Sequence, residues 1–413
     1  MNQIRPNIIC FLTDRLHPGY LGAYGNSWIG TAAFDRLAGE SVLFDRAFAA
    51  SLSLPALYRA FWYGHEPFAA DLSVPNEKKP GFFGRLFAKE SAAPVSPLFA
   101  ALSGAGYRTV LVTDDMETAR LGKGLFEKVE LISPAKGIAE TAEQSAVFRG
   151  LTGAAAAASR MARGGAPFFL WIHLKGWDGI WDTPQQLRDE AREDDDDPPP
   201  YGGANPPLFE TSPDAGDDPL RAVAETYAAG IRLWDASLDF FLDMLNREDL
   251  FERTALFVGG ARGLSLGEHL RVGPGEAGNL YFEEIHVPLL YRPAGRPSEA
   301  VRSFALCGPA DLHRTLLRLA GEEPNEKTLL DLASEETESI RSELSVTQAD
   351  ASSPRQGVIT DEWFLLRDTA SVPPRRELYL VPDDRWNVNE VADRAGEEVL
   401  DELEGKIGCG GFA

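Results

Sequence analysis

The chain has 413 residues, of which 44% are hydrophobic and 10% aromatic, so it is long enough to bury a large core and is typical of a globular protein. Its formal net charge of −23 argues against a nucleic-acid partner, because a phosphate-binding surface would have to form against the overall field. The three widely spaced cysteines, Cys10, Cys307 and Cys409, do not make a disulfide framework. The apolar stretch before Asp14 is too short for a membrane span, so we expect a cytoplasmic protein unless a leader has been removed.

Short apolar runs rich in β-branched or aromatic residues predict strands that are buried on both faces of a sheet. In chain order these runs are Ile8–Leu12, Val110–Val112, Phe168–Ile172, Ala255–Val258 and Val287–Tyr291. Helical patterns lie between them, and apolar residues spaced three or four apart form one stripe from Tyr227 to Leu245. This alternation predicts an α/β fold with a mostly parallel, doubly wound sheet and functional loops at the strand ends.

Three polar stretches interrupt this pattern. Ser73–Pro97 holds a small Phe82-Phe83 patch, and Glu193–Pro219 begins with an acidic run that is either a solvated loop or a cation-binding segment. The third, Ala333–Pro354, precedes two expected strands and a closing helix, which are Gly357–Arg367, Arg376–Val381 and Leu400–Ile407. We therefore predict a main α/β domain at 1–332, a linker at 333–356, and a C-terminal subdomain at 357–413 with a small antiparallel sheet and a terminal helix.

Several short motifs occur in a recognisable order along the chain. In sequence they read Arg5-Pro6-Asn7, Leu12-Thr13-Asp14, Tyr20-Leu21-Gly22-Ala23-Tyr24-Gly25, Phe44-Asp45-Arg46-Ala47, Gly106-Tyr107-Arg108, Leu266-Gly267-Glu268-His269 and Ile285-His286-Val287-Pro288. Together they resemble the sulfatase family. The resemblance implies the alkaline-phosphatase-like fold, with a smaller antiparallel subdomain at the C-terminus. It also implies a divalent cation, usually calcium, held by four side chains beside a formylglycine made from Cys or Ser.

The metal-binding motifs depart from this family pattern. The first loop of the family carries two consecutive aspartates, whereas here Asp14 is followed by Arg15. The second loop of the family reads Asp-His-Gly or Asp-Asn-Gly, and in register it reads Ala261-Arg262-Gly263. Because a hard cation needs several oxygen ligands, Asp14 alone between two arginines is not expected to hold calcium or magnesium. We therefore expect no cofactor.

The nucleophile motif is also altered. Ser53 stands two residues before Pro55, at the family's nucleophile position, but Leu57 occupies the place of the family's arginine. Arg59 comes two residues late and would point about 200° away on a helix, unless a shift in alignment brings it into register. His173 and His269 fall near family histidines and are either general acids or structural residues. Trp177 and Trp181, which flank Asp178, either line a pocket for a sugar or aryl group or pack beneath the acidic loop.

Two hypotheses follow for the vacated metal position. Either Arg15 and Arg262 fill it and one or both pair with Asp14, or both arginines turn to solvent.

The first hypothesis for the function is an inactive sulfatase-like protein that serves in binding or assembly. Arg15 and Arg262 would then be available to a sulfate- or phosphate-bearing molecule, or a protein partner would dock on Phe82-Phe83 and the acidic loop. The alternative is a divergent hydrolase of sulfate or phosphate esters that uses Ser53, Arg59 and a histidine, with calcium or magnesium.

Overall fold

The computed structural model describes residues 5–67, 96–192, 198–214, 216–274, 279–295, 300–333, 337–348, 353–381 and 383–408. The predictions made for Phe82-Phe83, for the acidic run at 193–197 and for Cys409 lie outside these residues. None of the helices within these ranges is both long and apolar enough to cross a membrane.

The main sheet has eight strands in the order β11-β2-β10-β7-β1-β5-β3-β4. All neighbours pair in parallel except β10, which is antiparallel to both β2 and β7. The strands are β1 (Asn7–Thr13), β2 (Val42–Ala47), β3 (Arg108–Thr113), β4 (Lys128–Leu131), β5 (Phe168–Leu174), β7 (Thr254–Gly260), β10 (Leu289–Arg292) and β11 (Val301–Cys307). Each apolar run interpreted as a strand overlaps one of them, and the predicted fold class is confirmed.

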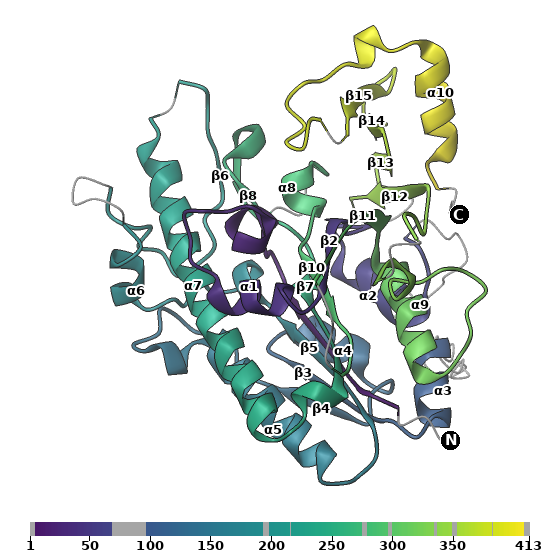
Figure 1. Ribbon diagram of the computed structural model, residues 1–413. Coiled ribbons are helices and arrows are strands. Elements are labelled where there is room, and N and C mark those ends of the chain that lie inside the picture. The colour runs from purple at the N-terminus through teal and green to yellow at the C-terminus, as the bar shows by residue number, and fades with distance from the viewer. Residues whose placement is uncertain are drawn as a thin grey trace, which may run out of the picture.

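Helices cover both faces of this sheet (Figure 1). One face is covered by α1 (Ala32–Ala38), α5 (Ala146–Ala162) and α7 (Asp218–Arg247), and the other by α2 (Leu54–Tyr63), α3 (Pro97–Gly104) and α9 (Pro309–Ala320). Strand β1 contributes side chains to the hydrophobic cores on both faces of the sheet, because successive side chains of a strand point to opposite faces. Ile9 and Phe11 lie in the core beneath α1, α5 and α7, and Ile8 and Cys10 lie in the core beneath α2, α3 and α9. The described part of this domain also contains the shorter α-helices α4 (Met116–Gly122), α6 (Gln185–Asp189) and α8 (Phe282–Ile285).

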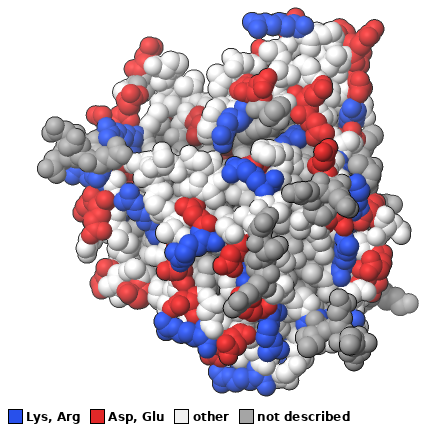
Figure 2. All heavy atoms as spheres, viewed as in Figure 1, with Lys and Arg blue, Asp and Glu red and all other residues white. Residues whose placement is uncertain are grey.

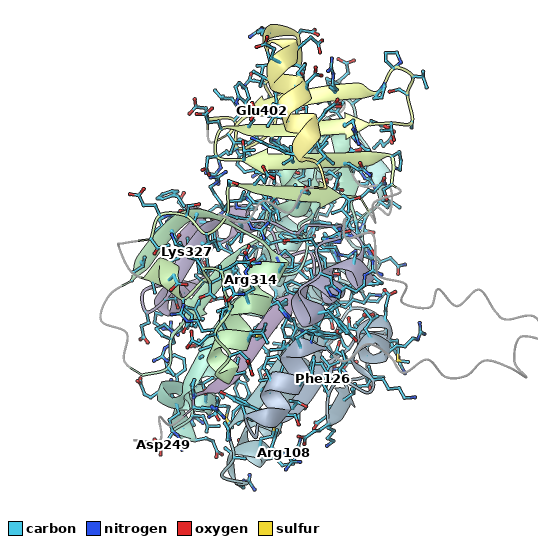
Figure 3. All side chains as sticks on the ribbon, turned by 90° about the vertical axis from the view of Figure 1, so that its right-hand side faces the viewer. Arg108, Phe126, Asp249, Arg314, Lys327 and Glu402 are labelled. Atoms are coloured by element: carbon cyan, nitrogen blue, oxygen red, sulfur yellow. The ribbon has the colours of Figure 1, made fainter. Side chains whose placement is uncertain are left out.

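A second, antiparallel sheet forms the C-terminal part of the molecule, with α10 (Glu397–Lys406) lying across it (Figure 3). Its strands are β12 (Glu343–Thr347), β13 (Arg355–Thr360), β14 (Trp363–Asp368) and β15 (Arg375–Leu380). Leu400 and Leu403 of α10 pack on one face of this sheet, and the other face packs on the main domain.

Two sequence predictions for this region need correction. The single strand expected at 357–367 is a hairpin of β13 and β14, because the chain turns at Asp361 and Glu362. Residues 343–347 of the predicted linker form β12, which pairs with β13. The alternation of buried Leu344 and Val346 with polar neighbours is the signature of a strand, and the polar composition around it concealed this short pattern.

A third, small sheet has the order β6-β9-β8 and lies beside the N-terminal part of α7. It consists of β6 (Phe209–Glu210), β8 (Ser265–Leu266) and β9 (Arg271–Gly273). The outer surface of the molecule carries acidic and basic side chains that are interspersed over the face seen in Figure 2, so neighbouring charges of opposite sign offset one another there.

Candidate active-site cleft

The candidate site lies where β1, β5 and β7 end. These three strands are parallel neighbours, so their carboxyl ends meet at one edge of the sheet. Asp14 follows β1 directly, and its backbone amide donates to the Leu174 carbonyl at 2.9 Å. Ala261 follows β7, and its amide donates to the Thr13 carbonyl at 3.0 Å. These bonds extend the pairing beyond the strands and bring Arg262 next to Asp14.

Arg262 forms a two-pronged contact with Asp14. Its Nε donates to Asp14 Oδ1 at 3.0 Å and its Nη2 donates to Oδ2, so both carboxylate oxygens are engaged by one guanidinium. The remaining terminal nitrogen, Nη1, donates to the Leu52 carbonyl at 2.7 Å. Asp14 is fully buried and Arg262 is only 8% exposed. The predicted contact between these two side chains is therefore present, and Arg262 does not turn to solvent.

Arg15 also points inward, but its side chain pairs with a different carboxylate. Its Nε donates to Asp178 Oδ1 at 3.1 Å, and its Nη1 donates to the Gly263 carbonyl at 3.1 Å. The backbone of Arg15 has a positive φ of 61°, which is uncommon outside glycine. This turn is held by Tyr227, whose hydroxyl donates to the Arg15 carbonyl at 2.8 Å.

Two glycines, Gly263 and Gly176, allow the loops of the site to pack closely against neighbouring backbone. A Cβ at Gly263 would lie 2.2 Å from the Glu283 carbonyl oxygen, and a Cβ at Gly176 would lie 2.5 Å from the Asp14 carbonyl oxygen. Gly176 also has a φ of 51°. Any side chain at either position would push apart the backbone segments that carry Asp14 and Arg262.

The charges of the pair shift the ionisation of both partners. Burial alone would raise the pKa of Asp14, but the charge and hydrogen bonds of Arg262 outweigh it and lower the pKa. Burial likewise opposes the charged form of Arg262, yet Asp14 raises the pKa of that guanidinium. Arg15 is different, because burial and the neighbouring Arg262 charge lower its pKa. The Asp14–Arg262 pair is therefore a carboxylate and a guanidinium that keep each other charged.

These side chains form part of the wall of a cleft of about 620 Å³. Three basic residues, Arg15, Lys175 and Arg262, face four acidic ones, which are Asp14, Asp115, Glu117 and Asp178. Ser53, Leu52, Leu54, Pro55, Pro274 and Gln348 complete the lining. The cleft therefore carries at least as much negative as positive formal charge.

Ser53 reaches this cleft, whereas Arg59 is not among the lining residues. Ser53 is the N-cap of α2, because its Oγ accepts from the Ala56 amide at 3.4 Å, and its own amide donates to Ser51 Oγ. Leu57, at the place of the family's arginine, is fully buried in the core. Arg59 follows two residues later on the same helix, about 200° round from Leu57, and its charge contributes to lowering the pKa of His65.

Neither predicted histidine lines the cleft among the described residues. His173 is the penultimate residue of β5 and is fully buried, and neither ring nitrogen has a hydrogen-bond partner in the described part of the chain. Its ring lies edge-on to Tyr58 at 5.5 Å, and burial lowers its pKa. His269 bonds Glu283 through Nδ1 at 2.8 Å and the Asn387 carbonyl through Nε2 at 2.9 Å. The contact with Asn387 joins the second loop to the C-terminal part.

Sequence reasoning missed several residues of the cleft. Asp178 is the partner of Arg15, and Lys175 and Asp115 line the same wall. A positional signal was available, because Lys175 and Asp178 follow β5 and Asp115 follows β3, and both strands end at the same edge as β1. The sequence could not show which arginine pairs with which carboxylate.

A family model described as Sulfatase matches residues 6–322. The chain belongs to the sulfatase family. No curated protein matched the sequence. Among solved structures, a putative sulfatase from Bacteroides thetaiotaomicron is 18% identical with a TM-score of 0.71, covering 97% of this chain and 91% of that one. The phosphonate monoester hydrolase of Agrobacterium radiobacter is 17% identical with a TM-score of 0.67, covering 97% and 96%.

A third similar structure is of a protein in complex with its substrate, D-glucosamine-2-N,6-O-disulfate. It is 16% identical, with a TM-score of 0.70, and the match covers 97% of this chain and 96% of that one. At these identities the likeness establishes the fold and leaves the chemistry to be argued from the residues of this sulfatase-family chain.

The metal that sulfatases use does not fit the residues present here. A hard divalent cation needs several oxygen ligands that are free to face it. Both oxygens of Asp14 accept from Arg262, and the Arg15 amide also lies 3.2 Å from Oδ1. In the described ranges, no group of three or more His, Cys, Asp or Glu side chains is arranged to hold a metal ion. We therefore assign no chemical step to a metal.

Proposed function

We propose that this chain is a sulfatase-family protein without hydrolytic activity that serves in binding or assembly. The observation that carries the proposal is the two-pronged contact of Arg262 with Asp14. A guanidinium occupies both oxygens of the carboxylate that family members offer to the cation, so the positive charge is supplied by a side chain. Because Asp14 already offsets that charge, the guanidinium stabilises a sulfuryl oxygen less than a divalent cation would.

The surroundings of Ser53 support the same proposal. A covalent mechanism needs a nucleophile activated by a neighbouring base or metal. Within the described residues, the hydrogen bonds of Ser53 are those of a helix cap, to Ala56 and Ser51. No histidine or carboxylate bonds to its hydroxyl there, so the divergent-hydrolase alternative has no activating group in this structure.

Recognition of a sulfate or phosphate group by Arg15 and Arg262 remains a prediction that the charge of the cleft does not favour. Each arginine already faces a carboxylate, at Asp178 and Asp14 respectively. An incoming anion would have to displace one of these partners and would also meet Asp115 and Glu117. A polar ligand of balanced charge suits the cleft better than an anion.

Turnover tests the loss of activity. The purified chain is assayed with 4-nitrophenyl sulfate and 4-nitrophenyl phosphate, with and without added calcium, and mass spectrometry determines whether Ser53 is unmodified. We expect no turnover above the blank and an unmodified serine. Turnover that Ser53→Ala abolishes would overturn the proposal.

A gain-of-binding variant tests the assignment of the lost metal ligands. Arg15→Asp, Ala261→Asp and Arg262→His together restore the residue types that the family carries in these two loops. We expect calcium binding by calorimetry in this triple variant and none in the starting chain. The matched control combines Arg15→Ala with Arg262→Ala, which removes both arginines without adding ligands and is expected to bind no calcium.

A further inference from the structure

A second hollow lies next to the cleft, and Lys175 and Asp178 line both. This indole cavity has a volume of about 320 Å³, and its wall includes Trp177, Trp181 and Trp234. The volume falls in the range of small-molecule sites. Pro134 and Asn205 on its rim are exposed, so the cavity is open to solvent.

The aromatic wall is held firmly in place by α7. The Tyr227 ring lies 4.7 Å from Trp177 and 6.0 Å from Trp181, measured between ring centroids. Trp181 Nε1 donates to the Trp177 carbonyl at 3.0 Å. A Cβ at Gly230 would approach Trp177 Nε1 to 2.8 Å, so the absence of a side chain there leaves space for the indole. The wall is therefore preorganised, which reduces the entropy lost when a ligand binds.

Carboxylates outnumber cations on this wall. Asp114, Asp178 and Asp182 line the cavity together with a single basic residue, Lys175. Asp178 is compensated by Arg15. Asp114 accepts from the Lys175 amide at 2.7 Å and Asp182 accepts from the Ala146 amide at 2.6 Å, but no described Lys, Arg or His nitrogen lies within ion-pair distance of either. Burial raises the pKa of both carboxyl groups and outweighs their backbone hydrogen bonds and the more distant charges of Arg149 and Arg188 that act on Asp182.

We infer that the indole cavity binds a small organic cation, such as a methylated or protonated amine. Indole surface attracts an ammonium group through the ring quadrupole, and Asp114 and Asp182 supply the opposite charge. An anion would be repelled by the same two carboxylates. A bare metal ion lacks the necessary cluster of ligands among the described residues. The assignment is independent of whether the neighbouring cleft is catalytically silent.

The test is calorimetric titration of the full chain with choline as the probe, compared with its neutral carbon isostere 3,3-dimethylbutan-1-ol and with inorganic sulfate. We expect saturable binding of choline that is at least about tenfold tighter than binding of the isostere, because only the cation gains from the carboxylates and the indoles. Sulfate is expected not to bind.

Variants locate the binding to this cavity. Asp182→Asn removes a charge while its side-chain oxygen can still accept from the Ala146 amide, and it is expected to weaken choline binding about tenfold. Asp239→Asn, on the exposed face of α7, is the matched control and is expected to change nothing. Trp181→Leu should abolish binding and Trp181→Phe should retain part of it.

Three results would each overturn the inference. The first is equal affinity for choline and its isostere, which would make this an apolar site. The second is unchanged choline affinity in Asp182→Asn, and the third is the absence of any saturable binding to the unmodified chain. Because the isostere comparison uses only the unmodified protein, the inference stays falsifiable even where a tryptophan variant fails to fold.

Discussion

Breaking the Asp14–Arg262 pair should cost far more than breaking an exposed ion pair. In Arg262→Met, Asp14 would remain fully buried with an uncompensated charge. Removing one partner of a buried pair typically costs about 3–5 kcal/mol in the free energy of unfolding. Asp14→Asn keeps the shape and leaves Arg262 with Leu52 and Asp178 as partners, so it should cost about 1–3 kcal/mol.

The double variant isolates the interaction itself. With both Asp14→Asn and Arg262→Met, no unpaired charge remains at Asp14, so the combined cost should fall below the sum of the single costs. We expect a coupling free energy of about 2–3 kcal/mol. The matched control is the exposed pair Arg36–Asp239, whose side chains are 62% and 57% exposed. The cycle of Arg36→Met and Asp239→Asn should give a coupling of at most about 0.5 kcal/mol.

Urea unfolding at pH 7 measures these quantities, with circular dichroism and tryptophan fluorescence recorded together. Coincident transitions are required before the free energies are compared, since a chain of this length can unfold in steps. The cost of Arg262→Met should also shrink toward pH 4, because the unpaired Asp14 can then take up a proton. A coupling at Asp14–Arg262 no larger than that of the exposed control pair would refute the reasoning.

Three further predictions concern pH and backbone fit. The pKa of Asp14 is lowered in the folded chain. The stability that the Asp14 carboxylate contributes should therefore be fully present above about pH 4 and lost as the pH falls through the lowered pKa. The urea midpoint of Asp14→Asn should not show this acid-dependent decrease. Burial opposes the charged form of His269, but Glu283 raises its pKa. The stability that the His269–Glu283 pair contributes should be present below about pH 6.5 and lost as the pH rises through the raised pKa. The urea midpoint of His269→Gln should therefore vary less between pH 6 and pH 9. Gly263→Ala should destabilise by about 1–3 kcal/mol by thermal unfolding, since its Cβ would meet the Glu283 carbonyl, whereas Gly202→Ala, with nothing within 4 Å, should not. An unchanged Asp14→Asn profile, an unchanged His269→Gln profile or equal glycine costs would each contradict the corresponding argument.

The fold class could be predicted from the sequence because the central strands are continuous apolar runs. Runs such as Ile8–Leu12 are apolar on both faces and sit at the centre of the sheet, where burial leaves little ambiguity. The edge strand β11 has exposed Arg302 and Phe304 among its buried residues and escaped notice. Strand β12 was hidden in a polar stretch, because five residues of alternation are a weak signal.

The site was predictable in part, for a different reason. The replacement of family ligands by Arg15 and Arg262 is a local sequence fact, and the cost of burying Asp14 alone makes one partner a physical requirement. The choice of partner depends on loop geometry, because the positive φ of Arg15 turns its side chain toward Asp178. Tyr227 on α7, more than two hundred residues away, bonds the Arg15 carbonyl and helps to hold that geometry.

Metal content tests the central claim most directly. The purified chain is equilibrated with calcium, freed of unbound ion and analysed by inductively coupled plasma mass spectrometry, with Asp14→Asn treated in parallel. We expect far less than one ion per chain in both samples, because Arg262 occupies both oxygens of Asp14. One calcium ion per chain that Asp14→Asn removes would contradict it.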